Sequence, residues 1–268
     1  VWRRMPTFAG QEQRRNTETA MTDIRQYLDS TYLETPATAG ITPEEYREKA
    51  RKYIQEAIDE HFKLIMIRPD QVAVARRMID ESHSEVLVGT VIGFPEGTYS
   101  TEEKLTEARR ALADGADELD FVVDYPMYKR GKVEYVAQQV YVCTDLVLQA
   151  GKTAKWILET AALRPDEIEG LSELIRDTVL DNFGKEAAPR VFLKTSTGFF
   201  KPADGRPGGA TPEAVRILVE AGAPLPVKAA GGVRDLRAAE QMIALGVTRI
   251  GTSSAKKLVQ GEASSAQY

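Results

Sequence analysis

The feature of the sequence that most constrains the fold is a regular alternation of short apolar runs with capped helical segments. Parallel strands joined by helical crossovers produce this alternation. Eight such units within about 230 residues favour a closed (β/α)8 barrel over an open doubly wound sheet. The expected strands are Tyr27–Leu33, Lys63–Ile67, Val86–Ile92, Glu118–Asp124, Ala154–Thr160, Val191–Thr197, Leu225–Gly231 and Arg249–Ser254.

Capping residues mark the helices expected between these strands. Thr42–Glu45 and Ser100–Glu103 have the pattern of capping boxes, and Thr211–Glu213 opens a further helix that Gly222 ends. No linker or low-complexity tract divides the chain. We therefore expect one barrel domain at residues 25–260, preceded by a flexible leader at 1–24 and followed by a mobile tail at 261–268.

Two lysines interrupt runs that are otherwise apolar. Lys194 lies in the sixth expected strand and Lys228 in the seventh. Strands of a parallel barrel are covered on both faces, and lysine is almost never fully buried without a compensating reason. An exposed strand end or an ion pair would explain one such lysine. Two at matching places in consecutive strands favour catalysis by an amine.

Amine catalysis requires an unprotonated lysine, whereas free lysine has a pKa of about 10.4. Neighbouring strands lie about 4.8 Å apart, so burial and like charge can lower the pKa of either Lys194 or Lys228. One lysine then forms a Schiff base and the other stays charged. Asp120 in the fourth strand can accept a proton, relay it through water and balance the lysines, or form a structural ion pair. Asp29 in the first strand can join this network or cap a loop.

Glycine- and serine-rich turns follow the last three expected strands. Gly198 follows the sixth, Gly231 and Gly232 lie at the end of the seventh, and Gly251, Ser253 and Ser254 lie at the end of the eighth. Barrel enzymes often bind phosphate after strands 7 and 8, where glycine lets backbone N–H groups approach an anion. One Gly-Gly pair would be only a tight turn, but the three turns together predict a phosphate site.

These residues resemble the deoxyribose-phosphate aldolase family, a class I aldolase family on the (β/α)8 fold, from about Leu28 to Ser254. The resemblance rests on Thr90–Pro95, Gly115–Asp120, Leu158–Thr160, Lys194–Gly198 and Lys228–Arg234. It implies that Lys194 forms the Schiff base, that Lys228 perturbs it, and that Asp120 is the acid of the proton relay. It also implies a phosphate grip made by Gly198, Gly231, Gly232, Gly251, Ser253 and Ser254.

The reaction implied by the resemblance is reversible cleavage of 2-deoxy-D-ribose 5-phosphate to acetaldehyde and D-glyceraldehyde 3-phosphate, in deoxynucleoside and deoxyribose catabolism. The chain departs from the family at Phe199, where some members have a lysine, and the stretch before the sixth strand, which runs through Asp181–Lys185, is long. The chain ends in Tyr268, and some members likewise finish with tyrosine. We hypothesise that Tyr268 helps proton transfer at the methyl carbon of acetaldehyde; a chain end without a role is the alternative.

Composition limits the cofactors and partners. With 35 basic and 40 acidic residues, the net charge of −5 disfavours a nucleic-acid partner. Two histidines and one cysteine make a metal centre improbable, so we expect no metal and no cofactor. The single Cys143, with no secretion signal and no apolar run of about 18 residues, predicts a cytoplasmic protein without a membrane span. The expected partner is a small phosphosugar, and a homodimer or homotetramer is left open.

Two other functions are compatible with the same pattern. The first is a different Schiff-base lyase or transaldolase that acts on another phosphosugar. The second is a barrel that binds phosphosugars without catalysis. The joint presence of Lys194, Lys228 and Asp120 argues against this second function.

Overall fold

Eight parallel strands close into a barrel, in which each strand pairs with the next and β8 pairs with β1. The computed structural model describes residues 23–205 and 208–261. The strands are β1 Leu28–Tyr32, β2 Leu64–Ile67, β3 Leu87–Ile92, β4 Glu118–Val122, β5 Thr153–Ile157, β6 Val191–Lys194, β7 Val227–Ala230 and β8 Arg249–Thr252. This topology confirms the predicted single-domain (β/α)8 fold.

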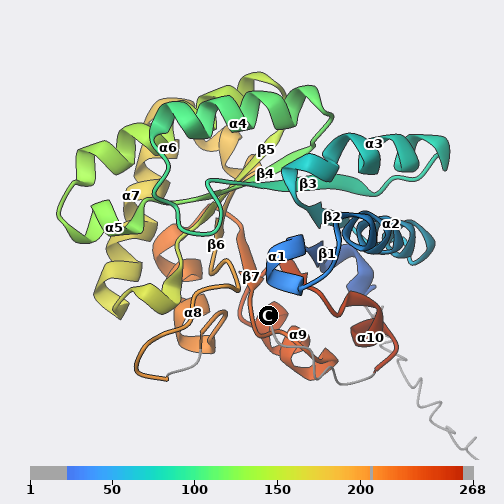
Figure 1. Ribbon diagram of the computed structural model, residues 1–268. Coiled ribbons are helices and arrows are strands. Elements are labelled where there is room, and N and C mark those ends of the chain that lie inside the picture. Colours follow the sequence, from blue (N-terminus) through green and yellow to red (C-terminus); the bar gives the residue numbers. More distant parts are fainter. Residues whose placement is uncertain (1–22, 206–207, 262–268) are drawn as a thin grey trace, which may run out of the picture.

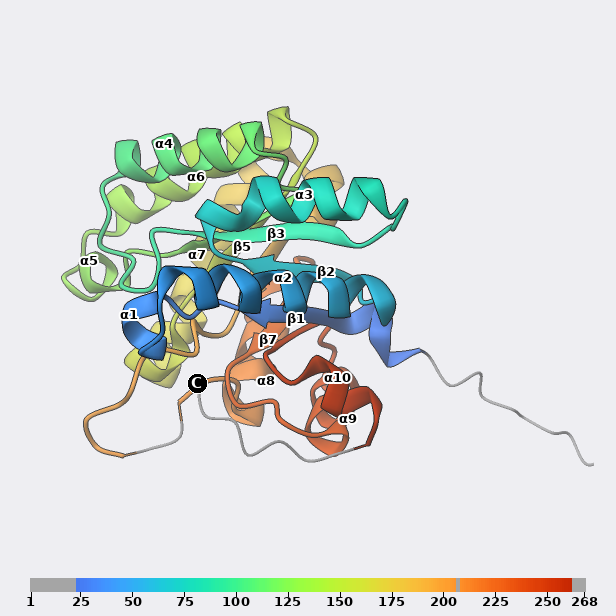
Figure 2. The ribbon, with the colours of Figure 1, turned by 45° about the vertical axis from the view of Figure 1, so that its right-hand side comes forward.

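Helices cover the outside of the barrel, and two views show them around the central strands (Figures 1 and 2). The α-helices are α1 Pro36–Ala39, α2 Pro43–Asp59, α3 Val72–Glu81, α4 Thr101–Ala113, α5 Tyr125–Lys129, α6 Val133–Gln149, α7 Pro165–Phe183, α8 Pro212–Gly222, α9 Leu236–Ala244 and α10 Ala255–Val259. Short 3-10 helices are η1 Ile24–Tyr27, η2 Pro69–Gln71, η3 Thr160–Ala162 and η4 Lys185–Arg190.

The predicted helix caps are present. At the start of α2, the Thr42 hydroxyl accepts from the Glu45 N–H, and the Glu45 carboxylate accepts from the Thr42 N–H at 2.8 Å. Ser100 and Glu103 form the same pair of bonds at the start of α4. Thr211 caps α8 by accepting from the Ala214 N–H. Each cap satisfies backbone N–H groups that the first helical turn leaves without a partner.

Several strands end earlier than the apolar runs predicted. β6 stops at Lys194 and β7 at Ala230, so that residues 195–197 and Gly231 belong to loops. The Thr195 hydroxyl donates to the Ala230 carbonyl and accepts from the Ala230 N–H, both at 2.9 Å. A side chain thus replaces the backbone ladder at this point. The loop after β6 consequently begins directly beyond Lys194, and the loop after β7 begins at Gly231, close to Lys228 in the sequence.

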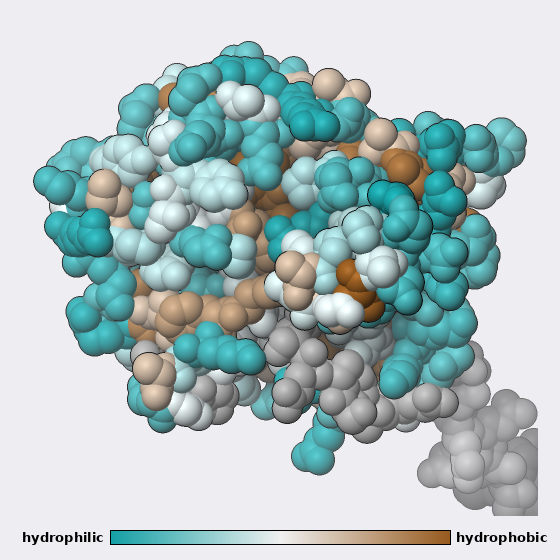
Figure 3. All heavy atoms as spheres, in the orientation of Figure 1, coloured by the Kyte–Doolittle hydropathy of each residue, from teal (hydrophilic) through white to brown (hydrophobic). Residues whose placement is uncertain are grey.

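The predicted leader and tail fall almost entirely outside the described residues, and their boundaries stay predictions. Among the described residues, no helix has the length and apolarity needed to cross a membrane. Figure 3 shows that the face seen in Figure 1 is mostly hydrophilic, with hydrophobic side chains near its centre.

The buried side chains form two separate layers. Outward-facing residues of the strands pack against the surrounding helices in one large cluster. Inside the barrel lies a smaller apolar cluster, formed by Leu33, Leu64, Met66, Val91, Phe94, Val122 and Ile157. The inner cluster fills only part of the barrel, because charged side chains occupy the rest.

Candidate active site

Lys194 and Lys228 lie directly beside each other, because β6 and β7 pair in a register that places one opposite the other. Both side chains are buried and point to the same carboxylate oxygen. Oδ2 of Asp120 accepts from Nζ of Lys194 at 2.8 Å and from Nζ of Lys228 at 2.9 Å. The three residues that the sequence singled out for the chemistry are therefore in direct contact.

Two further carboxylates and two further cations extend this contact into a buried network. Lys155 on β5 donates to Oδ1 of Asp120 at 2.7 Å and lies 2.5 Å from Oε2 of Glu118. Arg249 on β8 binds Glu118 through two nitrogens, at 3.0 and 3.1 Å. Burying ions costs several kcal/mol each unless opposite charges and hydrogen bonds compensate, and this network supplies both.

Asp29 joins the network on the side of Lys228 and Arg249. Its Oδ1 accepts from Nε of Arg249 at 2.8 Å, and its Oδ2 lies 2.5 Å from Nζ of Lys228. Asp29 therefore does not cap a loop. It contacts Lys228 and Arg249, and thus acts on Lys194 only through its neighbour.

The balance of charge singles out Lys194. The network contains four cationic side chains and three carboxylates, so full ionisation would leave one positive charge in excess. Burial, opposed by Asp120 and aided by Lys228, lowers the pKa of Lys194 to about 8. Burial is the largest of these causes, and the charge of Lys228 is a smaller one. When Lys194 loses its proton, three positive charges remain and balance the three carboxylates.

Asp120 stays ionised in this surrounding. Burial alone would raise the pKa of Asp120, but the three ammonium groups around it hold the pKa well below its usual range. For Lys155, burial is outweighed by Asp120 and Glu118, so that its pKa is raised and it remains a cation. Asp120 can therefore take a proton only as positive charge leaves its surroundings.

Sequence reasoning missed three members of this network. Lys155 interrupts an apolar run just as Lys194 does, and the same signal could have found it. Glu118 was placed at the entrance of its strand, but it is buried inside the barrel. Arg249 begins β8 and gave no signal, since a charged residue at the start of a strand is ordinarily solvated.

The predicted phosphate loops converge at the carboxyl ends of β6, β7 and β8. Gly198, Gly231 and Gly232 all line a cavity of about 290 Å³. Their φ angles of 86°, 87° and 84° lie in the left-handed region that glycine adopts without strain. The backbone N–H groups of these three residues donate to no acceptor within residues 23–205 and 208–261. Free N–H groups grouped in this way can bind an anion.

The loop after β8 contributes to the same region. Gly231, Gly232, Gly251, Ser253 and Ser254 line a small adjoining space of about 20 Å³. Gly251 has a second reason to be glycine: a Cβ there would lie 3.0 Å from Cε of Lys228. This residue leaves room for the Lys228 side chain as well as lining the loop.

Two further glycines of this cavity were not predicted. Gly208 and Gly209 lie in the loop between β6 and α8. Gly209 faces Gly231 so closely that a Cβ on Gly209 would lie 2.3 Å from the Gly231 carbonyl oxygen. The two glycines do not directly follow a strand, and the pairing of β6 with β7 brings this loop to Gly231.

Phe199 does not provide the charge that a lysine would provide at its position. Its ring packs edge-on against Phe94, at 5.2 Å between centroids, and covers the inner apolar cluster. Lys201 and Arg234 line the cavity of about 290 Å³ instead. A cationic group is therefore supplied two residues later in the same loop.

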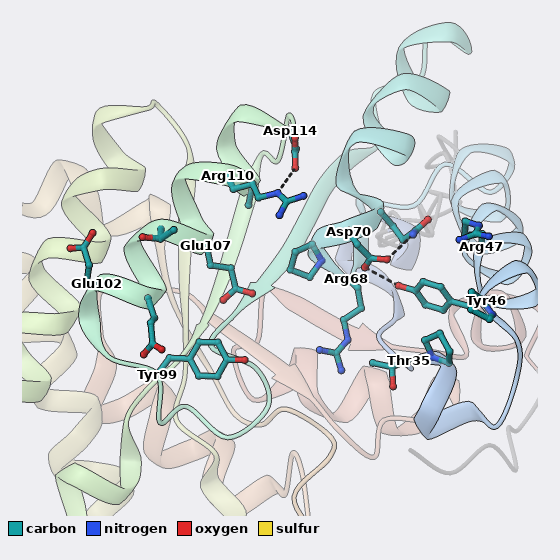
Figure 4. A pocket seen from close by; sticks show the side chains of 17 residues that line it. Thr35, Tyr46, Arg47, Arg68, Asp70, Tyr99, Glu102, Glu107, Arg110 and Asp114 are labelled. Carbon is teal, nitrogen blue, oxygen red and sulfur yellow. Dashed lines mark hydrogen bonds and ion pairs between the residues drawn. The ribbon is translucent and has the colours of Figure 1, made fainter.

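A separate cavity, of about 860 Å³, lies away from this network, between α2, η2 and α4. In Figure 4, Arg68 and Tyr99 extend into it from opposite sides. None of the buried lysines of the barrel lines it. Tyr268, the other predicted site residue, lies outside the described residues. No group of three His, Cys, Asp or Glu side chains in the described part of the chain could hold a metal ion.

A closed (β/α)8 barrel that buries a lysine of lowered pKa beside a second lysine and a carboxylate suits carbonyl chemistry. Comparison with known proteins gives the family. Residues 24–260 match the DeoC/LacD family of aldolases, and the chain belongs to that family. It is an aldolase, that is, a carbon–carbon lyase.

Individual relatives agree with this assignment. The chain is 38% identical over 240 residues to the deoxyribose-phosphate aldolase of Thermococcus gammatolerans, covering 89% of this chain and 96% of that protein. The solved structure of QR15, an aldolase, superposes with a TM-score of 0.75 at 30% identity, covering 90% of this chain and 96% of that one. The tetrameric deoxyribose phosphate aldolase from Aeropyrum pernix has a TM-score of 0.71 at 29% identity, covering 89% and 90%.

Proposed function

We propose that this protein reversibly cleaves 2-deoxy-D-ribose 5-phosphate to acetaldehyde and D-glyceraldehyde 3-phosphate, with Lys194 as the residue that forms the Schiff base. The observation that carries the proposal is the contact of Lys194 and Lys228 with one oxygen of Asp120. A pKa of about 8 makes an appreciable fraction of Lys194 neutral near physiological pH, which nucleophilic attack requires.

The first chemical step joins the substrate to the enzyme. The neutral amine of Lys194 attacks C1 of the open-chain sugar, and loss of water leaves an imine that can take up a proton. Lys228 lies beside it, in contact with Asp29 and Asp120. This neighbour disfavours a second positive charge on the free amine, and it can donate a proton to the departing hydroxyl.

The second step breaks the bond between C2 and C3. A base removes the proton of the C3 hydroxyl, the C2–C3 electron pair moves into an enamine, and glyceraldehyde 3-phosphate leaves. We assign Asp120 to this proton relay, acting through water. The ammonium groups around Asp120 hold it ionised. In this assignment Asp120 accepts a proton when one of these ammonium groups gives up its own. Protonation of C2 and hydrolysis then release acetaldehyde and restore Lys194.

The phosphate is assigned to the loops beyond β6, β7 and β8. The N–H groups of Gly198, Gly231 and Gly232 have no acceptor among the described residues, which supports this assignment, and Lys201 and Arg234 add positive charge to the same cavity. Gly251, Ser253 and Ser254 complete the proposed grip from β8. A dianion at this end places the aldehyde carbon toward the lysines, since the loops begin directly above them.

Trapping with borohydride tests the proposal. The protein is incubated with acetaldehyde and sodium borohydride, and the modified residue is located by mass spectrometry of peptides. The expected product is a reduced adduct on Lys194 in the parent, and none on that peptide in Lys194→Met. An adduct on Lys155 or Lys228, or no adduct, would contradict the assigned role.

Three further assignments belong to this proposal. The protein is proposed to act in the cytoplasm on a small phosphosugar, and the tetrameric relative supports assembly into a homo-oligomer. Tyr268 is assigned to proton exchange at the methyl carbon of acetaldehyde. Deletion of Tyr268 should slow deuterium exchange into that methyl group; exchange at the parental rate would remove Tyr268 from the mechanism.

A further inference from the structure

A buried glutamate lies beside the proposed phosphate cavity, where a carboxylate is not expected. Glu159 follows β5 and lines the same cavity as Gly198 and Gly231. It is 1% exposed, and burial raises its pKa. Negative charge beside a dianion opposes binding, so the presence of Glu159 calls for another explanation.

The backbone of Glu159 is held in an unusual conformation. Its φ of 59° and ψ of 62° lie in the left-handed region, which residues with a side chain rarely adopt. Such a conformation persists only where surrounding contacts determine it, and it is frequent at functional sites. Here the conformation turns the side chain toward the loop that follows β6.

The Glu159 carboxylate organises that loop through Thr197. Oε2 of Glu159 accepts from the Thr197 N–H at 3.2 Å and also bonds the Thr197 hydroxyl. Because this hydroxyl donates its proton to Glu159, its lone pairs are free, and it accepts from the Phe199 N–H at 3.0 Å. Three bonds therefore fix the residues on both sides of Gly198.

The consequence falls on the N–H group of Gly198. The N–H groups on either side of it donate to Glu159 (from Thr197) and to the Thr197 hydroxyl (from Phe199). The Gly198 N–H has no acceptor in the described part of the chain. Gly198 lines the cavity and has a φ of 86°. The oxygen of Glu159 that accepts these bonds is engaged with Thr197, which limits its repulsion of an anion in the cavity.

We propose that Glu159 is a positioning residue for the substrate phosphate: through Thr197 it holds the turn that presents the Gly198 N–H to the phosphate. This inference rests on the proposed function, because it assumes a phosphorylated substrate in this cavity. It assigns no chemical step to Glu159. The role requires an acceptor oxygen at this place and does not require its negative charge.

Kinetics on two substrates test the inference. Glu159→Gly removes the carboxylate, and glycine accepts the left-handed backbone. It should raise KM for 2-deoxyribose 5-phosphate about tenfold, the effect of losing one hydrogen bond to a charged group, and leave kcat within about twofold. Thr197→Val should act in the same direction. Glu159→Gln should stay close to the parent, because an amide oxygen also accepts both bonds.

Unphosphorylated 2-deoxyribose separates positioning from general damage. Its kcat/KM should be unchanged in Glu159→Gly and Thr197→Val. Glu169→Gln, an exposed change on α7, is the matched control and should behave as the parent. Equal losses on both substrates, or a Glu159→Gln variant as impaired as Glu159→Gly, would overturn the inference.

Binding of inorganic phosphate separates this inference from the proposed function. Calorimetry should show weaker phosphate binding by Glu159→Gly than by the parent and Glu159→Gln, whichever sugar the enzyme cleaves. If the parent binds phosphate but does not cleave 2-deoxyribose 5-phosphate, the proposed function fails and the positioning role stands. If the parent and Glu159→Gly bind phosphate equally well, the positioning role fails by itself.

Discussion

The interior of this barrel has two unlike halves. One part is apolar and is formed by side chains of β2–β5 and of the residues just after β1 and β3, among them Leu64, Met66 and Val122. In the other part, four cationic and three acidic side chains from β1 and β4–β8 form one connected network. The apolar half excludes water, and burial is the main cause of the low pKa of Lys194.

The two halves differ in what holds them together. Apolar side chains are interchangeable so long as volume is kept, since dispersion and burial have no direction. The members of the charged half are not interchangeable, because removal of one partner leaves another ion buried and uncompensated. Lys194 is the exception: the network is balanced without its charge.

The largest difference between the halves is expected at Lys194. Lys194→Met should reduce kcat for 2-deoxyribose 5-phosphate by at least about 10⁴-fold, as expected when a covalent nucleophile is lost. The free energy of unfolding should stay equal to the parental value or increase, because three cations then face three carboxylates. A coupled assay of glyceraldehyde 3-phosphate and urea denaturation measure the two quantities. A marked loss of stability would contradict the charge balance described above.

A stability loss is expected instead at Asp29. Asp29→Asn leaves Arg249 and Lys228 with one carboxylate partner fewer, and should lower the free energy of unfolding by about 3–5 kcal/mol. The pKa of Asp29 is below its usual value, because Arg249, Lys228 and Lys155 outweigh the effect of burial. This stabilisation is present above the unfolded pKa of about 3.9 and is lost as pH falls through the lower folded pKa.

Denaturation across pH checks this prediction. The difference in unfolding free energy between the parent and Asp29→Asn should be full at pH 7 and shrink below about pH 4. A difference that does not change with pH would show that the substitution acts through packing alone.

The next effect concerns the second lysine. Lys228→Met removes the neighbouring charge that helps to lower the pKa of Lys194. The pKa of Lys194 should rise above about 8, so the neutral amine becomes scarce, and kcat/KM at pH 7 should fall by up to about 10²-fold. Since a raised lysine pKa matters less as pH increases, part of this loss should be recovered at pH 9. If the limb of the pH–rate profile did not shift, Lys228 would have no influence on the pKa of Lys194.

The smallest effect is expected in the apolar half. Met66→Leu keeps approximately the same volume and should cost less than about 1.5 kcal/mol of stability. Met66 belongs to the inner apolar cluster and the substitution changes no charge, so the limb of the pH–rate profile set by Lys194 should stay at about 8. Thermal unfolding measures the change in stability, and the pH–rate profile gives the position of the limb. A shifted limb would show that the halves are electrostatically coupled more closely than their contacts suggest.

Much of this protein could be predicted from local patterns. The alternation of apolar runs and capped helices predicted the barrel, because these patterns reflect interactions within a few residues of each other. Lys194, Lys228 and Asp120 could be found because a charge within an apolar run is conspicuous. The glycine turns were found by the same reasoning, but Gly208 and Gly209 precede no strand signal and were missed.

What the sequence by itself determined is which residues sit in strands and which of those are charged. The tertiary structure decided which of these charges meet. Glu118 and Arg249 are 131 positions apart and bond only because the barrel closes through β8 and β1. The register of neighbouring strands decided that Lys155 would lie beside Asp120, and the pairing of β5 with β6 brings Glu159 to Thr197. The physical reason is that an ion pair depends on distance in space, which strand register and barrel closure set and local sequence does not.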